Sequence, residues 1–202
     1  MHAVRQPVTD LTESDLRAMR FKDLMALFGR LPAPSLQDMD GEFAARLLAQ
    51  PNAAAQVIGH LTVNNPLMPG RWLCKAFTPV SADRGQGYNS FAHLGRTVQR
   101  YPMQTLIAPS RYDGRPAYTL VYAAFSSMCG AIHMVDEVRR VAPGLYLGIG
   151  TWGFTDGQRQ VPLPFMLRGP IAPYAGHIGR RKQGFNVHQE IPALRHTARQ
   201  KG

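Results

Sequence analysis

Two acids and two arginines stand together in one short segment, Asp136-Glu137-Val138-Arg139-Arg140. If this segment is a β-strand, Asp136 points to one face of the sheet and Glu137 to the other, with one arginine on each side. An inward carboxylate is costly unless it is well bonded, so it would be unusual and informative. It could hold the polar end of a ligand, with Arg139 assisting, or transfer a proton. Alternatively the charges form solvated pairs at a rim, and the sequence leaves open which acid points inward.

Histidine and cysteine are the other side chains that could bind a metal or a cofactor. His133, close to the two acids, is the best histidine candidate for an acid–base role or for haem ligation. No two of the seven histidines stand two or four residues apart, and no H-E-x-x-H occurs. Cys74 and Cys129 lie far apart and are expected to be free thiols. The sequence therefore predicts no metal site, and the catalytic candidates are Asp136, Glu137 and His133.

Tyrosines and glycines alternate along two later segments. Tyr118 and Tyr122 would share one face of a strand, and Tyr146 would share another with Trp152 and the two glycines between them. Glycines at alternate positions thin the wall of a sheet and leave room for a ligand or a bulky neighbour. Tyrosine hydroxyls inside an apolar pocket suit a carbonyl or carboxylate. These four aromatic residues are therefore either ligand-binding residues or ordinary wall residues.

The segment Gly70-Arg71-Trp72 opens the part of the chain that is rich in glycine, proline and aromatic residues, and Lys75 follows it. Glycine permits a sharp turn into a strand, and tryptophan is large enough to plug the end of a barrel. Trp72 and Lys75 are therefore expected at the ligand site. On the alternative interpretation, Trp72 seals the core and supports the pocket without touching a ligand.

The longer pattern G-R-W-L-C-K-A-F resembles the opening motif of the lipocalins and the wider calycin group, and is similar to poorly characterised bacterial lipocalin-like proteins. The resemblance implies an antiparallel β-barrel that holds a small apolar ligand. It also implies an arginine from a late strand lying over the tryptophan, for which Arg168 is nearest by position. The helices expected at the N-terminus depart from the usual lipocalin plan.

The spacing of alternating apolar residues predicts a mainly β fold. About eight strands are expected at intervals of roughly ten residues, a spacing typical of a meander that closes into a barrel. Asp113-Gly114 and Pro143-Gly144 are expected hairpin turns. The predicted strands cover residues 71–80, 88–91, 97–101, 103–108, 116–125, 132–141, 145–154 and 161–167.

The N-terminal third of the chain has a helical pattern instead. Residues 12–31 form an amphipathic segment that begins with Thr12 and Asp15, which approximate a capping box. Shorter helices are expected at residues 42–49 and 51–62. We therefore divide the chain into an N-terminal helical segment (1–66) packing on the barrel, the barrel (67–176) and a basic, mobile tail (177–202). The helices would either close one mouth of the barrel or form a homodimer surface.

The net charge of +10 raises the question of nucleic-acid binding. Half of the excess lies in the tail, and no contiguous basic run or nucleic-acid motif occurs in the barrel region. Weak attraction to anionic surfaces is expected, but sequence-specific binding is not. No apolar run is long enough to span a bilayer, and no signal-peptide core is present, so a cytoplasmic location is expected.

The sequence lacks the G-x-S-x-G elbow of many hydrolases and the P-loop of nucleotide-triphosphate enzymes. We therefore expect intracellular binding of a small apolar or amphipathic molecule, such as a fatty acyl, isoprenoid or aromatic metabolite. The alternative is an isomerase, cyclase or lyase that uses an interior carboxylate with a tyrosine or His133. A second alternative is a haem-binding barrel, although no cofactor is expected.

Overall fold

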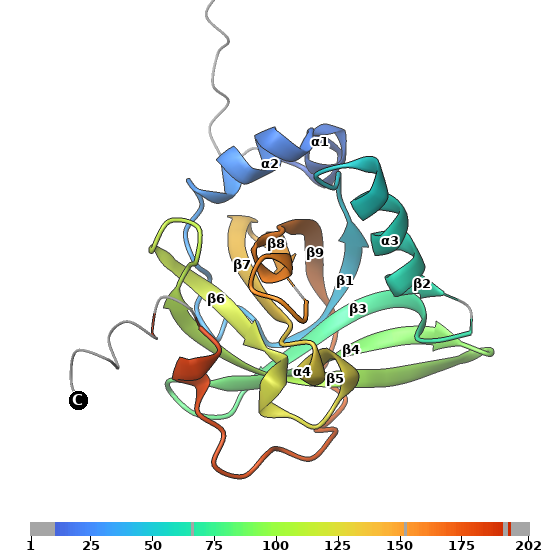
Figure 1. Ribbon diagram of the computed structural model, residues 1–202, viewed down its shortest axis with the longest axis vertical. Helices are drawn as coiled ribbons and strands as arrows, with labels where there is room; N and C mark the ends of the chain where they lie inside the picture. The colour runs from blue at the N-terminus through green and yellow to red at the C-terminus, as the bar shows by residue number, and fades with distance from the viewer. Residues whose placement is uncertain (1–10, 66, 152, 192–193, 195–202) are drawn as a thin grey trace, which may run out of the picture.

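The computed structural model describes residues 11–65, 67–151, 153–191 and 194. Its centre is one antiparallel sheet that closes on itself (Figure 1). The hydrogen-bonded order runs from β1 through β9 and back along the chain to β3, and β1 also pairs with β3, so eight strands form a closed barrel. The strands are β1 (Gly41–Leu47), β3 (Gly70–Pro79), β4 (Gly85–His93), β5 (Arg96–Pro109), β6 (Pro116–Val121), β7 (Val135–Ala142), β8 (Leu145–Thr151) and β9 (Leu163–Ala172). The expected mainly β barrel is confirmed.

The prediction of a helix at residues 42–49 is wrong, because this segment forms β1. Its alanines and leucines favour a helix locally, but its backbone pairs with both β3 and β9 and thereby closes the barrel. Phe43 is fully buried inside and packs against the rings of Phe77 and Tyr146. Tertiary pairing therefore overrides the local propensity of this segment.

Two short helices, α1 (Glu13–Ala18) and α2 (Phe21–Phe28), replace the single helical segment expected at the N-terminus. The capping box forms, with Asp15 N donating to Thr12 Oγ1 and Thr12 N donating to Asp15 Oδ2. Extended backbone at Met19 and Arg20 separates the helices. Both helices lie across the outside of the barrel (Figure 1), where Leu16, Leu24 and Phe28 join a cluster with outward side chains of β8 and β9.

The remaining short elements connect the strands. α3 (Ala53–Val63) begins at the cap Asn52, runs along the outside near β1 and β3, and ends in the two-residue strand β2 (Asn64–Asn65). Between β6 and β7 the chain forms η2 (Tyr122–Ala124) and α4 (Met128–Ala131), so the strands expected over 116–125 and 132–141 are shorter than predicted. The strands expected at 97–101 and 103–108 are one strand, β5, in which Tyr101 has a φ of 55°. Two further short elements are η3 (Gln158–Gln160), which lies between β8 and β9, and η4 (Val187–Gln189), which follows β9.

The described part of the C-terminal tail contacts the barrel. Lys182 N donates to Ala124 O, Arg181 donates to Gln104, and Ile191 is buried against Ala108. Among the described residues no helix is long and apolar enough to cross a bilayer.

The barrel has packed side chains on both faces of β7. Its inward residues join the interior cluster, while its outward residues lie beneath the N-terminal helices and the turn that joins β5 to β6. Five consecutive residues of β7, from Val135 to Arg139, are therefore buried. This burial puts both acids of the segment under cover, on opposite sides of the sheet.

Candidate functional site

A cavity of about 380 Å³ extends into the barrel; it is lined mainly by apolar side chains and is polar at one end. Leu47, Val63, Phe91, Met134, Leu163 and Phe165 are among the apolar lining residues. The polar end is formed by Lys75 of β3, Asn89 of β4 and Asp136 of β7. Tyr122, immediately after β6, contacts all three. We call Lys75, Asn89, Tyr122 and Asp136 the polar cluster.

The strand register explains why these four residues meet. Lys75 and Asn89 are direct cross-strand partners. Asp136 pairs with Leu120, two residues before Tyr122. A bulge in β3 between Trp72 and Cys74 changes the alternation, so Trp72 and Lys75, three residues apart, both line the cavity.

Lys75 and Asp136 form an ion pair in the interior. The distance from Lys75 Nζ to Asp136 Oδ2 is 2.8 Å, and the side chains are 2% and 0% exposed. Nζ also donates to Tyr122 Oη at 2.5 Å and to Asn89 Oδ1 at 3.1 Å. All three donors of the ammonium group therefore have acceptors, which is what a buried lysine requires.

Aromatic rings surround the same ammonium group. Nζ lies 5.2 to 5.3 Å from the ring centroids of Trp72, Tyr122 and Phe165. At these distances the ring faces attract a cation. The lysine is thus held both by hydrogen bonds and by its aromatic surroundings.

Tyr122 and Trp72 complete the network as donors. Tyr122 Oη donates to Asp136 Oδ2 at 3.1 Å and accepts from Asn89 Nδ2 at 3.2 Å, while Trp72 Nε1 donates to Asn89 Oδ1 at 3.1 Å. Burial, together with the nearby charge of Asp136, raises the pKa of Tyr122 well above its ordinary value. The phenol therefore keeps its proton and acts as a donor.

One acceptor of the cluster has no partner in the part of the chain that the structure describes. Asp136 Oδ1 is buried, and no described residue donates a hydrogen bond to it. Gly150 of β8 is the cross-strand partner of Asp136, and a Cβ atom at position 150 would lie 3.2 Å from Oδ1. The glycine therefore leaves space beside a carboxylate oxygen at the end of an apolar cavity. A buried acceptor without a partner costs about 1–3 kcal/mol.

Glu137 and Arg139 lie on the other side of the sheet, away from the cavity. Glu137 Oε1 accepts from Arg111 N at 2.9 Å, and burial raises the pKa of this carboxyl. Arg139 forms two hydrogen bonds of 2.7 Å with Asp113 and a third, of 2.8 Å, with Phe28 O. Arg139 therefore anchors the end of α2 to the barrel. The prediction that it lies at the ligand site is wrong, because its side chain points away from the cavity.

Tyr118 and Tyr146 belong to the packed interior and do not line the cavity. Tyr118 Oη donates to Thr105 Oγ1 at 2.9 Å, and its ring packs edge-on against Phe77. Tyr146 Oη contacts Asp38 O at 3.4 Å. Trp152, also expected at the site, lies outside the described residues.

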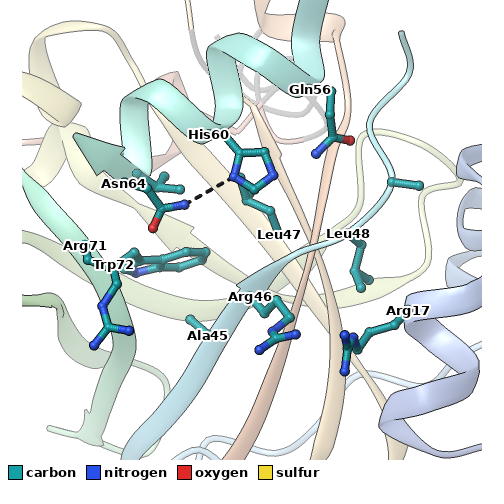
Figure 2. Close-up of a pocket in the computed structure, with 12 residues that line it drawn as sticks. Arg17, Ala45, Arg46, Leu47, Leu48, Gln56, His60, Asn64, Arg71 and Trp72 are labelled. Atoms are coloured by element: carbon teal, nitrogen blue, oxygen red, sulfur yellow. Dashed lines mark hydrogen bonds between the residues drawn. The ribbon is translucent and has the colours of Figure 1, made fainter. Parts of the chain in front are cut away.

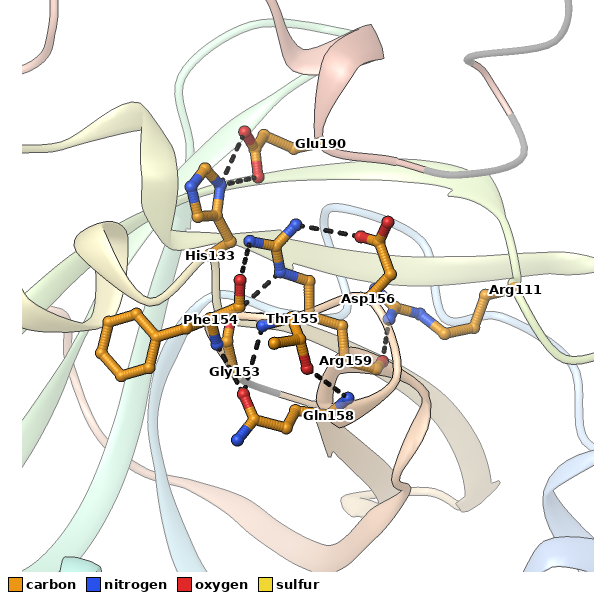
Figure 3. Close-up of polar contacts among 9 residues, drawn as sticks. All are labelled: Arg111, His133, Gly153, Phe154, Thr155, Asp156, Gln158, Arg159 and Glu190. Carbon is orange, nitrogen blue, oxygen red and sulfur yellow. Dashed lines mark hydrogen bonds and ion pairs between the residues drawn. The ribbon is translucent and has the colours of Figure 1, made fainter.

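His133 lies in the turn before β7 rather than on a strand, with a φ of 51°. Its Nδ1 is 2.9 Å from Glu190 Oε2, and the side chain is 41% exposed (Figure 3). The described residues that line the cavity include no histidine, so this position does not support haem ligation there. Nor do three or more His, Cys, Asp or Glu side chains gather into a metal site within the described ranges.

The arginine expected over Trp72 is also absent from that position. Arg168 is 60% exposed and pairs with Glu13 on α1 at 3.4 Å. The ring of Phe165 packs edge-on against Trp72 instead, with centroids 5.9 Å apart. Asn89 and Phe165 were not identified from the sequence, because only the strand register shows that they meet Lys75 and Trp72.

Comparisons with known proteins add little to this geometry. No family model and no curated protein matches the chain. One solved structure, described as a protein from Thermomonospora curvata, matches with 16% identity and a TM-score of 0.49, covering 74% of this chain and 87% of that one. Its description names no activity. The strand pairing itself shows that the chain is an antiparallel barrel.

Proposed function

We propose that this barrel binds a small, mainly apolar molecule that donates one hydrogen bond to Asp136 Oδ1. The observation that carries the proposal is a buried acceptor without a described partner at the end of an apolar cavity of about 380 Å³. A ligand that places a donor there satisfies the carboxylate and buries its own apolar surface at the same time.

The charge of the polar cluster indicates what kind of donor fits. Lys75 and Asp136 compensate one another, and the other two members are neutral. A charged group at this end of the cavity would leave one buried charge without compensation. The inner end of the ligand is therefore a neutral donor, such as a hydroxyl or an amide N–H.

The walls favour a flat or unsaturated body. Trp72, Phe91, Tyr101 and Phe165 all line the cavity, and aromatic faces pack well against rings and conjugated chains. Among the expected ligand classes, hydroxylated aromatic and isoprenoid metabolites therefore fit best. The expected lipocalin-like role in ligand binding is retained in this form.

Two closely related probes test the proposal. 2-Naphthol and 2-methoxynaphthalene share one ring system, but only the naphthol donates a hydrogen bond. A hydrogen bond to a charged acceptor contributes about 1.5 kcal/mol, so we expect the naphthol to bind about tenfold more tightly in a fluorescence titration. Equal affinities would contradict the role of Asp136, and no binding of either probe would contradict ligand binding in this cavity.

Proton transfer is a second candidate, favoured by the same free oxygen. Asp136 Oδ1 is placed as a base, while Lys75 and Tyr122 hold the other oxygen. On this hypothesis the protein accelerates exchange of the protons next to the carbonyl of 2-tetralone in D₂O, as followed by NMR. Asp136→Asn would abolish the acceleration. An exchange rate equal to that without protein would exclude this activity for that ketone.

A further inference from the structure

A second hollow, a groove of about 500 Å³, lies outside the barrel between α1, β1, α3 and β3. Arg17, Arg46, His60 and Arg71 line it (Figure 2), and none of the described lining residues is acidic. The guanidinium groups of Arg17 and Arg46 point toward one another from α1 and β1, with Arg71 across the groove. We call this hollow the basic groove.

The three arginines of the basic groove have no ion-pair partner among the described residues. Nearby Arg168 does have one, Glu13 at 3.4 Å, so acids are within reach of this side of the barrel. Arginines that converge without a carboxylate repel one another, and an oxyanion between them removes the repulsion and accepts their directed N–H groups. The groove therefore has the composition of a site for a carboxylate or phosphate group.

The basic groove and the interior cavity share a wall. Leu47, Val63 and Trp72 line both hollows. α3 separates them further along: Gln56 and His60 face the groove, whereas Gly59 and Thr62 face the cavity. No residue of α3 is buried, so this part of the wall between the two spaces lies at the surface of the protein.

We infer that the basic groove binds the anionic head group of the molecule whose apolar body occupies the cavity. This inference rests on the proposed function and extends it to a substrate class, an amphiphile with a neutral donor at its inner end and an oxyanion at its outer end. Arg17, Arg46 and Arg71 bind the oxyanion. Trp72 packs against the apolar part of the ligand where it passes from the groove into the cavity.

The test compares 10-hydroxydecanoate with its methyl ester by isothermal titration calorimetry. Both carry the hydroxyl for Asp136, and only the acid carries the charge. We expect the acid to bind at least tenfold more tightly at low salt, with the difference shrinking as ionic strength rises. Equal affinities would overturn the inference and leave the proposed function intact. No binding of either compound would also overturn the inference, and the naphthol titration decides the proposed function separately.

Matched variants locate the charge effect. Arg46→Gln and Arg17→Gln are each expected to lower the affinity for the acid about fivefold and to leave the affinity for the ester unchanged. Arg96→Gln removes the same charge from the exposed first residue of β5, which does not line the basic groove, and should change neither affinity. If Arg96→Gln lowers the affinity for the acid as much as Arg46→Gln does, only the net charge of the protein matters and the basic groove does not bind the carboxylate.

Sodium acetate distinguishes a head-group site from a site for free anions. At an ionic strength matched with chloride, acetate should compete with 10-hydroxydecanoate only at concentrations at least a hundredfold higher. Competition at equal concentration would show that the apolar chain contributes nothing, which would overturn the link between the two hollows.

Discussion

Breaking the ion pair of the polar cluster should destabilise the barrel far more than breaking a surface pair. Lys75→Met leaves the carboxylate of Asp136 fully buried without its countercharge. Losing one partner of a buried pair costs about 3–5 kcal/mol, a large share of the 5–15 kcal/mol that a typical domain has. Arg84→Met is the matched control, because its pair with Asp83 is 47% and 73% exposed and should matter by less than about 1 kcal/mol.

A double-mutant cycle separates the pair from the packing around it. Replacing both partners, in Lys75→Met with Asp136→Leu, removes both charges and leaves the Tyr122 hydroxyl without its acceptor. We expect this double variant to lose only about 1–3 kcal/mol, less than either single variant. The coupling free energy should therefore be at least about 3 kcal/mol.

Urea unfolding followed by circular dichroism measures each free energy of unfolding. If Lys75→Met proves too unstable to purify, the double variant should still fold, and its free energy of unfolding can still be compared with that of the parent. Two single variants that each cost less than about 1 kcal/mol and add without coupling would refute a buried, mutually dependent pair.

Two other predictions concern the buried acid and the buried thiols. The raised pKa of Glu137 means that the folded state holds this proton to higher pH than the unfolded state, so the group's contribution to stability falls as pH rises from about 4.5 through the raised value. Glu137→Gln should accordingly gain stability relative to the parent over that pH range in urea unfolding; a difference that does not vary with pH would contradict burial of the carboxyl. Burial raises the pKa of Cys74 to about 11 and that of Cys129 to about 12, so neither thiol should react with iodoacetamide at pH 8 until urea unfolds the chain. Rapid labelling of Cys129 in the native protein, detected by peptide mass, would show that the cavity wall opens.

Much of the barrel could be predicted from its pattern of alternating residues, but the strand that closes it could not. Residues 41–47 contain alanine and leucine at spacings that also suit a helix. Only their pairing with β3 and β9 makes a strand more stable, and those partners lie 30 or more residues away in the chain.

The sequence predicted part of the candidate site, and the part that it did not predict depends on contacts between distant segments. Trp72, Lys75, Tyr122 and Asp136 were named from the sequence and lie together in the structure. The direction of Asp136 and Glu137 could not be predicted, because both faces of β7 are buried and alternation carries no polarity difference. The prediction that Arg139 lies at the ligand site was wrong because its partner, Asp113, comes from a turn elsewhere in the chain, and no local pattern shows that the two residues meet.

The hydrogen bond that a ligand is proposed to donate to Asp136 Oδ1 can be tested with the variant Gly150→Ala. The added methyl group would lie 3.2 Å from that oxygen, whereas in the control Gly157→Ala it meets no atom of the described residues within 4 Å. The measurement is the ratio of the affinities for 2-naphthol and 2-methoxynaphthalene in each variant. We expect the parent's preference for naphthol, about tenfold, to persist in Gly157→Ala and to vanish in Gly150→Ala. A preference that survives unchanged in Gly150→Ala would show that the donor is bound elsewhere.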